Sequence, residues 1–192
     1  MMHCLIVDEM HHSIIPLLEQ ISVKHDYRPG ITRKEILDII QNYEGIIVRS
    51  KTAMDQEILS KASKLKFIAR AGAGMDLIDV EECERRKIML INAPEGNRDA
   101  LAEHGIGLML NLLNKIHIAD LQVRKGIWDR EGNRGYELKG KTIALIGYGF
   151  MGKALAERLS SFQCTVIAYD KYRNGFSDSY VREVSLEEIY EQ

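Results

Sequence analysis

The sequence predicts an α/β protein, in which helices cover parallel β-sheets. Short runs of β-branched and aliphatic residues alternate with segments of helical periodicity along most of the 192 residues. The composition, with 45% hydrophobic and 28% charged residues, is that of an ordinary globular protein. A chain of this kind buries a sizeable core, as one large domain or two small ones.

The first ninety or so residues contain four expected strand–helix units. The expected strands are residues 3–7, 45–48, 65–69 and 88–91, and the expected helices are residues 13–21, 36–43, 55–62 and 77–86. Each strand is a short apolar run, as in a parallel sheet that is buried on both faces. These units predict a compact, flavodoxin-like domain.

A domain boundary is expected at residues 92–97, where Pro94 and Gly96 lie close together. Asn97 is expected to cap the helix that follows, over residues 100–119. That helix is apolar around most of its circumference, which predicts burial between layers or between subunits. Its internal polar and charged residues argue against a membrane span. The segment 121–138, which contains Trp128, is ambiguous.

Charge and cysteine content exclude several classes of function. A formal net charge of −2 gives no electrostatic reason to expect nucleic acid or an anionic membrane as partner, so a small-molecule ligand is the default. Cys4, Cys83 and Cys164 are far apart and show no CxxC spacing, so neither a disulfide framework nor a metal site is expected. We expect buried thiols in a reducing cytoplasm.

The clearest chemical motif is a glycine-rich turn between a strand and a helix. The apolar strand 141–146 leads into Gly147-Tyr148-Gly149-Phe150-Met151-Gly152, and a helix follows to residue 159. A second strand, 165–169, ends on Asp170. This order of strand, turn, helix and acidic strand end is the fingerprint of the first half of a Rossmann dinucleotide-binding domain.

Each residue of the fingerprint has a physical task. Gly147 allows the tight turn, Gly149 lets the backbone approach a pyrophosphate, and Gly152 lets the helix pack closely on the strand. Phe150 and Met151 lie at the start of the helix, where unpaired backbone N–H groups can bind the phosphates.

The strand end sets the choice of nucleotide. Asp170 can accept hydrogen bonds from both ribose hydroxyls and would repel a 2′-phosphate, so NAD is favoured over NADP. Lys171 and Arg173, just beyond the acid, temper that preference. Two alternatives remain open: a tight turn that binds no nucleotide, and an S-adenosylmethionine site.

Several separate motifs together resemble the D-isomer-specific 2-hydroxyacid dehydrogenase family. They are found at residues 48–52 (Val-Arg-Ser-Lys-Thr), 69–76 (Ala-Arg-Ala-Gly-Ala-Gly-Met-Asp), 92–97 (Asn-Ala-Pro-Glu-Gly-Asn), 102–104 (Ala-Glu-His) and 137–142 (Glu-Leu-Lys-Gly-Lys-Thr), and in the fingerprint itself. The resemblance implies a substrate domain over residues 1–96 and part of an NAD-binding domain over residues 97–192. It implies an oxidoreductase that moves hydride between NAD and a 2-hydroxy or 2-keto acid. A homodimer through the long helix and the Trp128 arm is also implied.

The resemblance also implies which residues bind substrate. Arg49 and Ser50 match the first substrate loop, and Arg70, Ala71, Gly72, Ala73 and Gly74 match the second. The backbone N–H groups of the second loop would meet the substrate carboxylate. Arg49 and Arg70 point to phosphoglycerate, the substrate that leads into serine biosynthesis, because an arginine fork matches a phosphate. Surface ion pairs are the alternative for both arginines.

No catalytic residue is assigned in this chain. The family's arginine, acidic residue and histidine are implied to lie beyond residue 192, so we expect a truncated polypeptide that lacks activity. For His104 and His117, packing or capping is the expected role, and His11 and His12 are given none. Ser185 and Glu188 form a capping pattern that opens a last helix. The alternative function is a non-catalytic nucleotide-binding or interaction protein.

Overall fold

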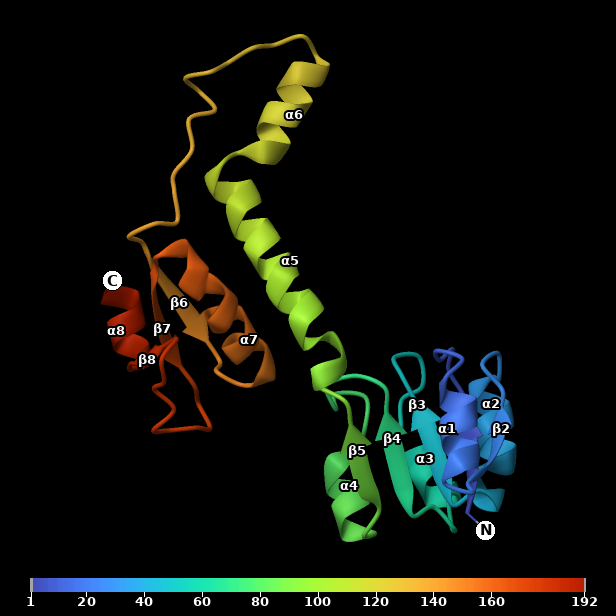
Figure 1. Cartoon of the computed structure of the whole chain (residues 1–192). Helices are drawn as coiled ribbons and strands as arrows, with labels where there is room; N and C mark the ends of the chain where they lie inside the picture. Colours follow the sequence, from blue (N-terminus) through green and yellow to red (C-terminus); the bar gives the residue numbers. More distant parts are fainter. Residues whose placement is uncertain (1, 192) are drawn as a thin grey trace. The chain divides into compact units, whose positions relative to one another are not determined.

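The structure is a computed structural model that describes residues 2–191, and it divides into two compact units (Figure 1). The N-terminal unit is Met1–Gly96 and the C-terminal unit is Asn97–Gln192. Each unit contains its own parallel sheet and its own hydrophobic core. The predicted α/β class is confirmed.

The N-terminal unit is built on a five-stranded parallel sheet. Its strands are β1 (His3–Ile6), β2 (Lys24–Tyr27), β3 (Gly45–Val48), β4 (Phe67–Arg70) and β5 (Met89–Asn92). They lie in the order β2-β1-β3-β4-β5, and every neighbouring pair is parallel. This order is that of flavodoxin-like folds, as predicted.

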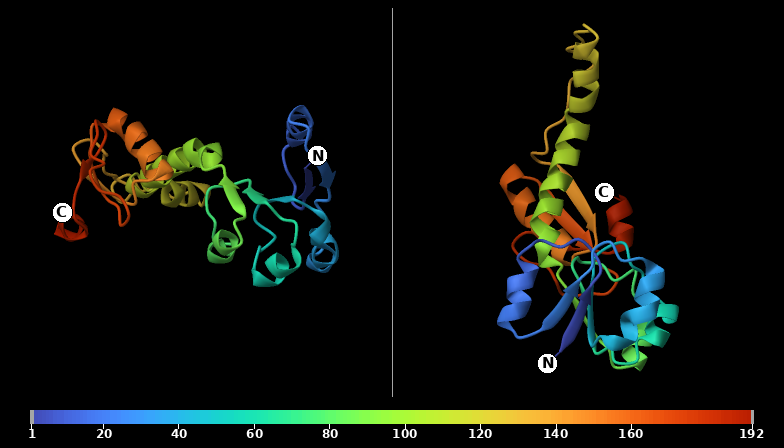
Figure 2. Two further views of the ribbon diagram at one scale, coloured as in Figure 1. Left: turned by 90° about the horizontal axis from the view of Figure 1, so that it is seen from below. Right: turned by 90° about the vertical axis from the view of Figure 1, so that its right-hand side faces the viewer.

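Helices cover both faces of this sheet. They are α1 (Ile14–Gln20), α2 (Arg33–Ile39), α3 (Gln56–Lys61) and α4 (Val80–Arg85), with the 3-10 helix η1 (Ile40–Asn42) after α2. Helix α1 lies on one face and α2, α3 and α4 lie on the other (Figure 2). Successive strand residues therefore point into different cores: Leu5 and Ile46 pack with α2 and α3, whereas Cys4 and Ile47 pack with α1.

Strand β2 was not predicted from the sequence, which indicated four strands in this unit. Its residues, Lys-His-Asp-Tyr, are polar and partly exposed, so no alternation of apolar residues marks it as a strand. It pairs only with β1, at the edge of the sheet. The Tyr43 hydroxyl donates to Asp26 Oδ2 at 2.6 Å, and the His3 Nε2 atom lies 3.0 Å from the same oxygen.

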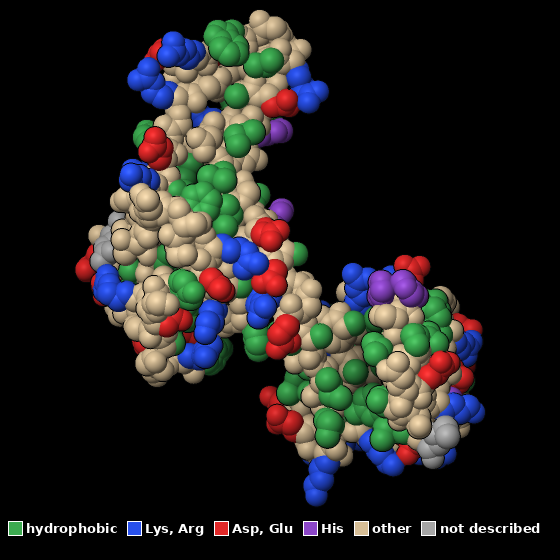
Figure 3. All heavy atoms as spheres, viewed as in Figure 1, with side chains coloured by type: hydrophobic (Ala, Val, Ile, Leu, Met, Phe, Trp, Pro, Cys, Tyr) green, Lys and Arg blue, Asp and Glu red, His purple; other side chains and the backbone are tan. Residues whose placement is uncertain are grey.

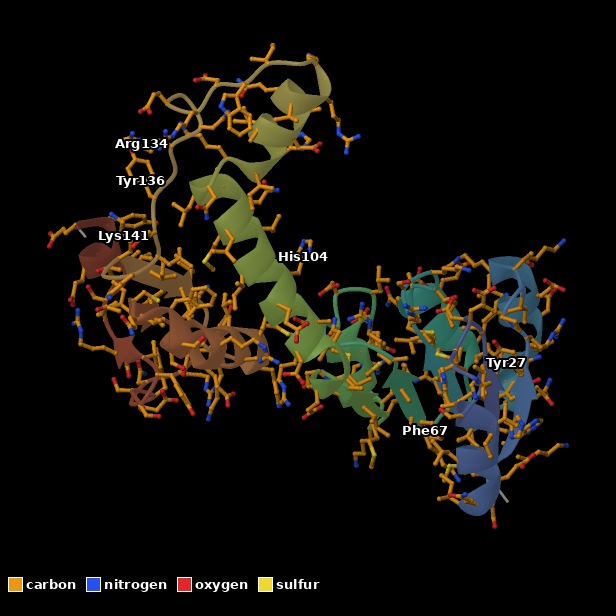
Figure 4. All side chains as sticks on the ribbon, turned by 45° about the horizontal axis from the view of Figure 1, so that its top comes forward. Tyr27, Phe67, His104, Arg134, Tyr136 and Lys141 are labelled. Atoms are coloured by element: carbon orange, nitrogen blue, oxygen red, sulfur yellow. The ribbon has the colours of Figure 1, made fainter. Side chains whose placement is uncertain are left out.

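A close approach between strands marks the centre of the sheet. Gly45 of β3 lies directly opposite Phe67 of β4, which Figure 4 labels. A Cβ atom at residue 45 would overlap the Phe67 ring. The ring therefore occupies the space that the glycine leaves.

The C-terminal unit combines helices with a three-stranded parallel sheet. Its helices are α5 (Glu95–Leu113), α6 (Ile116–Arg124), α7 (Phe150–Leu159) and α8 (Leu186–Glu191), with the 3-10 helix η2 (Ser160–Phe162) after α7. Its strands, β6 (Thr142–Ile146), β7 (Thr165–Tyr169) and β8 (Arg182–Glu183), lie in the order β6-β7-β8. This is the arrangement of the first half of a Rossmann domain.

The predicted helix over residues 100–119 is in fact two helices. Helix α5 ends at Leu113, and Lys115 follows in a left-handed conformation with φ of +52°. The side chain of Asn111 accepts the N–H of His117 at 2.9 Å, so a side chain of α5 helps to begin α6. The predicted cap, Asn97, is also wrong, because α5 begins at Glu95 and Asn97 lies inside its first turn.

Within the described chain, these two helices remain largely exposed. Ala102 is the one buried residue of α5, and α6 has none. Leu108, Leu112 and Ile116 are 56%, 78% and 53% exposed, and Figure 3 shows hydrophobic side chains on the surface along this segment. The long helix was predicted to be buried, but the described residues of this chain leave most of its apolar side chains exposed or half-buried. Among residues 2–191, no helix is both long enough and apolar enough to cross a bilayer.

Candidate functional site

The glycine-rich turn joins β6 to α7 in the C-terminal unit. Gly147 has φ of +102°, in the left-handed region where a side chain is strained, and its N–H donates to the Tyr169 carbonyl at 2.7 Å. That bond carries the pairing of β6 and β7 into the turn.

The two later glycines leave space of two different kinds. A Cβ atom at residue 149 would meet nothing within 4 Å, and Gly149 has φ of −84°, which any residue can adopt. A Cβ atom at residue 152 would overlap the carbonyl oxygen of Gly147. Gly149 therefore leaves open room above the turn, whereas Gly152 permits close packing beneath it.

Asp170 follows β7 and is bonded to the glycine turn. Its Oδ2 atom accepts the N–H of Tyr148 at 2.8 Å, and its Oδ1 atom accepts the N–H of Tyr172 at 2.9 Å. The Tyr148 N–H is the main cause that lowers the pKa of Asp170, and the Tyr172 N–H adds to it. The carboxylate is therefore ionised at neutral pH and still has lone pairs for further donors.

Side chains outside the predicted cofactor-binding residues hold this turn in place. Tyr148 is buried, donates its hydroxyl to Asp178 Oδ2 at 2.9 Å and stacks on Phe176 at 5.1 Å. The Arg173 guanidinium donates to the Tyr148 carbonyl at 2.8 Å. In the sequence, Tyr148 could have been selected because it is an aromatic residue between two glycines. No sequence pattern marks Asp178 as its partner.

A hollow of about 560 Å³ lies beside Asp170. Its lining includes three carboxylate residues, Asp170, Glu183 and Glu188, together with Asn174 and Ser185. Glu183 accepts the N–H of Phe176, and Glu188 pairs with Arg182 at 2.7 Å. The hollow is polar and acidic, which suits a ribose better than a phosphate.

Phe150 and Met151 occupy the first turn of α7, as expected. Phe150 is 52% exposed and Met151 is half-buried. Phe150 lines a smaller hollow of about 120 Å³ with Arg98 and Lys153. Neither Phe150 nor Met151 carries charge, so what the turn offers an anion is the backbone N–H groups at the start of the helix.

In the N-terminal unit, the two candidate substrate loops leave neighbouring strands at the same edge. Val48 at the end of β3 pairs with Arg70 at the end of β4. Arg49 and Ser50 are exposed, and the Arg49 guanidinium has no partner among the described residues. The loops that the sequence analysis selected are therefore brought together at one edge.

Arg70 is more constrained than the sequence analysis expected. Its Nε atom donates to the Arg49 carbonyl at 3.1 Å, and its Nη1 atom donates to the Gly74 carbonyl. Two of its donor nitrogens thus hold the backbone of both loops. Its remaining Nη2 atom is free of such bonds in the described chain.

Of the four backbone N–H groups of residues 71–74, two are hydrogen-bonded within the described chain and two are not. Ala71 donates to the Val48 carbonyl at 2.9 Å and Gly72 donates to the Arg70 carbonyl at 2.9 Å. Within the described residues, the N–H groups of Ala73 and Gly74 form no hydrogen bond. Asn92 fixes the loop from β5 by donating to the Ala73 carbonyl at 2.7 Å.

Asp8, which the sequence analysis missed, lies beneath the first loop. It is 2% exposed, and its Oδ2 atom accepts the N–H of Arg49 at 2.5 Å. The available signal was its place directly after a buried strand, at the edge of the sheet where flavodoxin-like folds bind ligands.

The histidines and cysteines considered in the sequence analysis belong neither to the glycine turn nor to the two substrate loops. His104 and His117 are exposed on α5 and α6, and Figure 4 shows the His104 side chain projecting from α5. Over residues 2–191, no three His, Cys, Asp or Glu side chains are grouped so that they could hold a metal ion. Burial raises the pKa of the Cys4 and Cys83 thiols to about 12 and about 11, so both are protonated at neutral pH.

The residues of the C-terminal unit fit a dinucleotide. The open space over Gly149, the uncapped start of α7 and the ionised Asp170 beside an acidic hollow match a pyrophosphate and a ribose in turn.

Comparison with known proteins gives a consistent family. Residues 4–190 match the model of the D-isomer specific 2-hydroxyacid dehydrogenase catalytic domain. The chain is 37% identical over 171 residues to a D-3-phosphoglycerate dehydrogenase of Archaeoglobus fulgidus, covering 89% of this chain and 32% of that protein. A D-3-phosphoglycerate dehydrogenase of Methanocaldococcus jannaschii is also 37% identical, over 90% of this chain and 33% of that protein. The chain thus spans about a third of the length of these relatives.

Solved structures show the same fold. A protein of Pyrococcus horikoshii OT3 matches with a TM-score of 0.86 and 28% identity, covering 98% of this chain and 59% of that one. A glyoxylate reductase of Paecilomyes thermophila matches with a TM-score of 0.85 at 22% identity, over 98% of this chain and 61% of that one. With a family model that spans nearly all of its residues, the chain belongs to the D-isomer-specific 2-hydroxyacid dehydrogenase family.

Proposed function

We propose that this chain forms the substrate-binding and adenosine-binding parts of an NAD-dependent oxidoreductase of 2-hydroxy acids, with 3-phosphoglycerate as its substrate. The observation that carries the proposal is the bond between Asp170 and the glycine turn, which presents an ionised carboxylate beside the acidic hollow. The names of the relatives at 37% identity support phosphoglycerate, a substrate that leads into serine biosynthesis.

Each group of residues has a defined part in this reaction. The bound dinucleotide supplies or accepts the hydride. The turn at Gly149 holds its pyrophosphate, and Asp170 accepts hydrogen bonds from the adenosine ribose. In the N-terminal unit, the N–H groups of Ala73 and Gly74, which form no hydrogen bond within the described residues, bind the substrate carboxylate as preorganised donors.

The substrate phosphate is assigned to Arg49. Its guanidinium is exposed and unpaired within the described chain, whereas Arg70 spends two donor nitrogens on backbone carbonyls. A planar guanidinium binds a phosphate through two parallel hydrogen bonds. Arg70 therefore acts mainly by holding the two loops together, and Arg49 with Ser50 faces the ligand.

Replacement of Asp170 tests the preference for NAD. The wild-type chain is expected to bind ADP-ribose more tightly than 2′-phospho-ADP-ribose, because the carboxylate bonds the ribose and repels a 2′-phosphate. Asp170→Ala removes both effects and should narrow the ratio of the two dissociation constants about 10-fold. Isothermal titration calorimetry measures both constants on the 192-residue chain.

Asp170→Asn is the matched control, because an amide can still accept the Tyr148 N–H but carries no charge. It should keep the turn folded and still narrow the ratio. A ratio that is unchanged in both variants would show that Asp170 does not select the nucleotide.

The proposal includes a homodimer that forms through α5 and α6. Their exposed apolar side chains, among them Leu108 and Leu112, make a surface that a monomer would leave in water. Leu108→Glu combined with Leu112→Glu should shift the mass measured by light scattering after size-exclusion chromatography from dimer to monomer. Leu17→Glu is the control, because Leu17 is 54% exposed but lies on α1. A monomeric wild-type chain would contradict this part of the proposal.

The proposal also places the protein in the cytoplasm. Cys4, Cys83 and Cys164 are all free thiols, as is usual in a reducing compartment.

A further inference from the structure

Asp8 is a buried carboxylate at a distinctive place in the N-terminal sheet. It lies two residues after the end of β1, and β1 lies between β2 and β3, where the strand order reverses. Ligands of open α/β sheets bind at such a switch point, outside the carboxyl ends of the strands. Asp8 is 2% exposed, so it lies at the base of this region rather than on its surface.

Two charged side chains, one from beyond the end of β1 and one from β4, fix the backbone of Arg49. The Asp8 carboxylate accepts its N–H at 2.5 Å, and the Arg70 Nε atom donates to its carbonyl at 3.1 Å. Asp8 follows β1 and Arg70 ends β4, so β3 is held from both sides. The guanidinium of Arg49 itself remains exposed and unpaired within the described chain.

This arrangement is a poor way to gain stability. Burial of a carboxylate is costly unless its oxygens are well bonded. Asp8 Oδ2 has one bond, to Arg49, and Oδ1 is buried with no hydrogen-bond partner among the described residues. An uncharged acceptor such as Asn would cost less to bury, but its amide oxygen would bond the same N–H more weakly. The buried charge therefore strengthens the bond to the Arg49 N–H, at a cost to the stability of the fold.

We propose that Asp8 is a positioning residue for Arg49, which it orients toward an anionic group of the ligand. The proposal rests on the proposed function, in which Arg49 binds the substrate phosphate. Charge-assisted hydrogen bonds to both the N–H and the carbonyl of Arg49 fix its backbone, and therefore the direction in which its side chain leaves the strand. A guanidinium that is oriented before binding loses less conformational entropy when the phosphate arrives.

A double-mutant cycle on the 192-residue chain tests this role. The probes are 3-phosphoglycerate and D-glycerate, and calorimetry or NMR titration measures their dissociation constants. Asp8→Asn should weaken 3-phosphoglycerate binding about 10-fold, the loss expected for one charge-assisted hydrogen bond. Binding of D-glycerate should change less than 3-fold. In the Arg49→Ala background, Asp8→Asn should have no further effect, because the residue that it positions is gone.

The control is Asp38→Asn, at an exposed position of α2, which should change neither affinity. Arg70→Lys removes the Nε donor from the other side of Arg49 and should reproduce the effect of Asp8→Asn. It therefore carries the test if circular dichroism shows that Asp8→Asn does not fold. Equal losses for Asp8→Asn in the wild-type and Arg49→Ala backgrounds would overturn the proposal.

Hydrogen exchange separates this proposal from the proposed function. The Arg49 amide should be protected in the wild-type chain and should exchange at least about 10-fold faster in Asp8→Asn, but not in Asp38→Asn. A wild-type chain that binds no 3-phosphoglycerate overturns the proposed substrate, while faster exchange in Asp8→Asn still supports the positioning of Arg49. Unchanged exchange of the Arg49 amide in a folded Asp8→Asn variant would overturn the positioning role itself.

Discussion

Gly149→Ala is expected to abolish ADP-ribose binding without destabilising the protein. Gly149 has an ordinary φ of −84°, and a Cβ atom there would meet nothing within 4 Å, so the free protein tolerates the methyl group. That open space is where the backbone must approach a pyrophosphate. Loss of two charge-assisted bonds at about 1.5–3 kcal/mol each would weaken binding by at least about 100-fold.

Gly152→Ala is the matched comparison, because the same methyl group should act on the fold. A Cβ atom at residue 152 would overlap the Gly147 carbonyl, so α7 must move away from the turn. Overpacking of this kind costs about 1–3 kcal/mol of unfolding free energy. Chemical denaturation and calorimetry measure both quantities. Equal loss of stability in the two variants, or ADP-ribose binding retained by Gly149→Ala, would contradict the assignment of separate tasks.

Turnover of 2-hydroxy or 2-keto acids by the 192-residue chain is expected to be absent. A proton donor must lie within about 2.6–3.2 Å of the substrate carbonyl oxygen, and the family resemblance implies a histidine outside these residues. His104 and His117 are exposed on α5 and α6. The described sheet of the C-terminal unit has three strands, which correspond to the half of a Rossmann domain that binds the adenosine part of a dinucleotide.

The assay follows NADH absorbance with phosphohydroxypyruvate, hydroxypyruvate and glyoxylate, on protein shown to be folded by circular dichroism. The Archaeoglobus fulgidus relative serves as the positive control. Turnover above about one per second, near the low end of typical enzymes, would contradict the expectation. It would mean that one of the residues present acts as the missing acid. Absent turnover with ADP-ribose binding retained would also fit a non-catalytic binding protein.

The sequence predicted those parts of the fold that rest on local apolar patterns. Strands β1, β3, β4, β6 and β7 consist mainly of apolar residues, and each was expected within a few residues of its place. Strand β2 has no such pattern, because an edge strand needs to bury little. The break between α5 and α6 depends on the Asn111 side chain reaching residue 117, which periodicity does not show.

The candidate site was predictable where a motif carries backbone chemistry. The three glycines and Asp170 were selected from their spacing and from the order of strand, turn, helix and strand, and the structure brings Asp170 to the turn. The bonds that hold them, such as Tyr148 to Asp178, join residues from separate segments and need the folded structure. The role of Arg70 also needed the folded structure. The family resemblance indicated that it binds the substrate phosphate, whereas two of its nitrogens donate to backbone carbonyls.

The contact between Gly45 and Phe67 has a consequence for the history of this family. Because the ring fills the space beside a residue that has no side chain, the two positions share one fixed volume. A side chain at position 45 would require the Phe67 ring to move aside or a smaller residue to replace it. The two sites are therefore expected to covary among homologues, for a steric reason that is independent of the chemistry of the site.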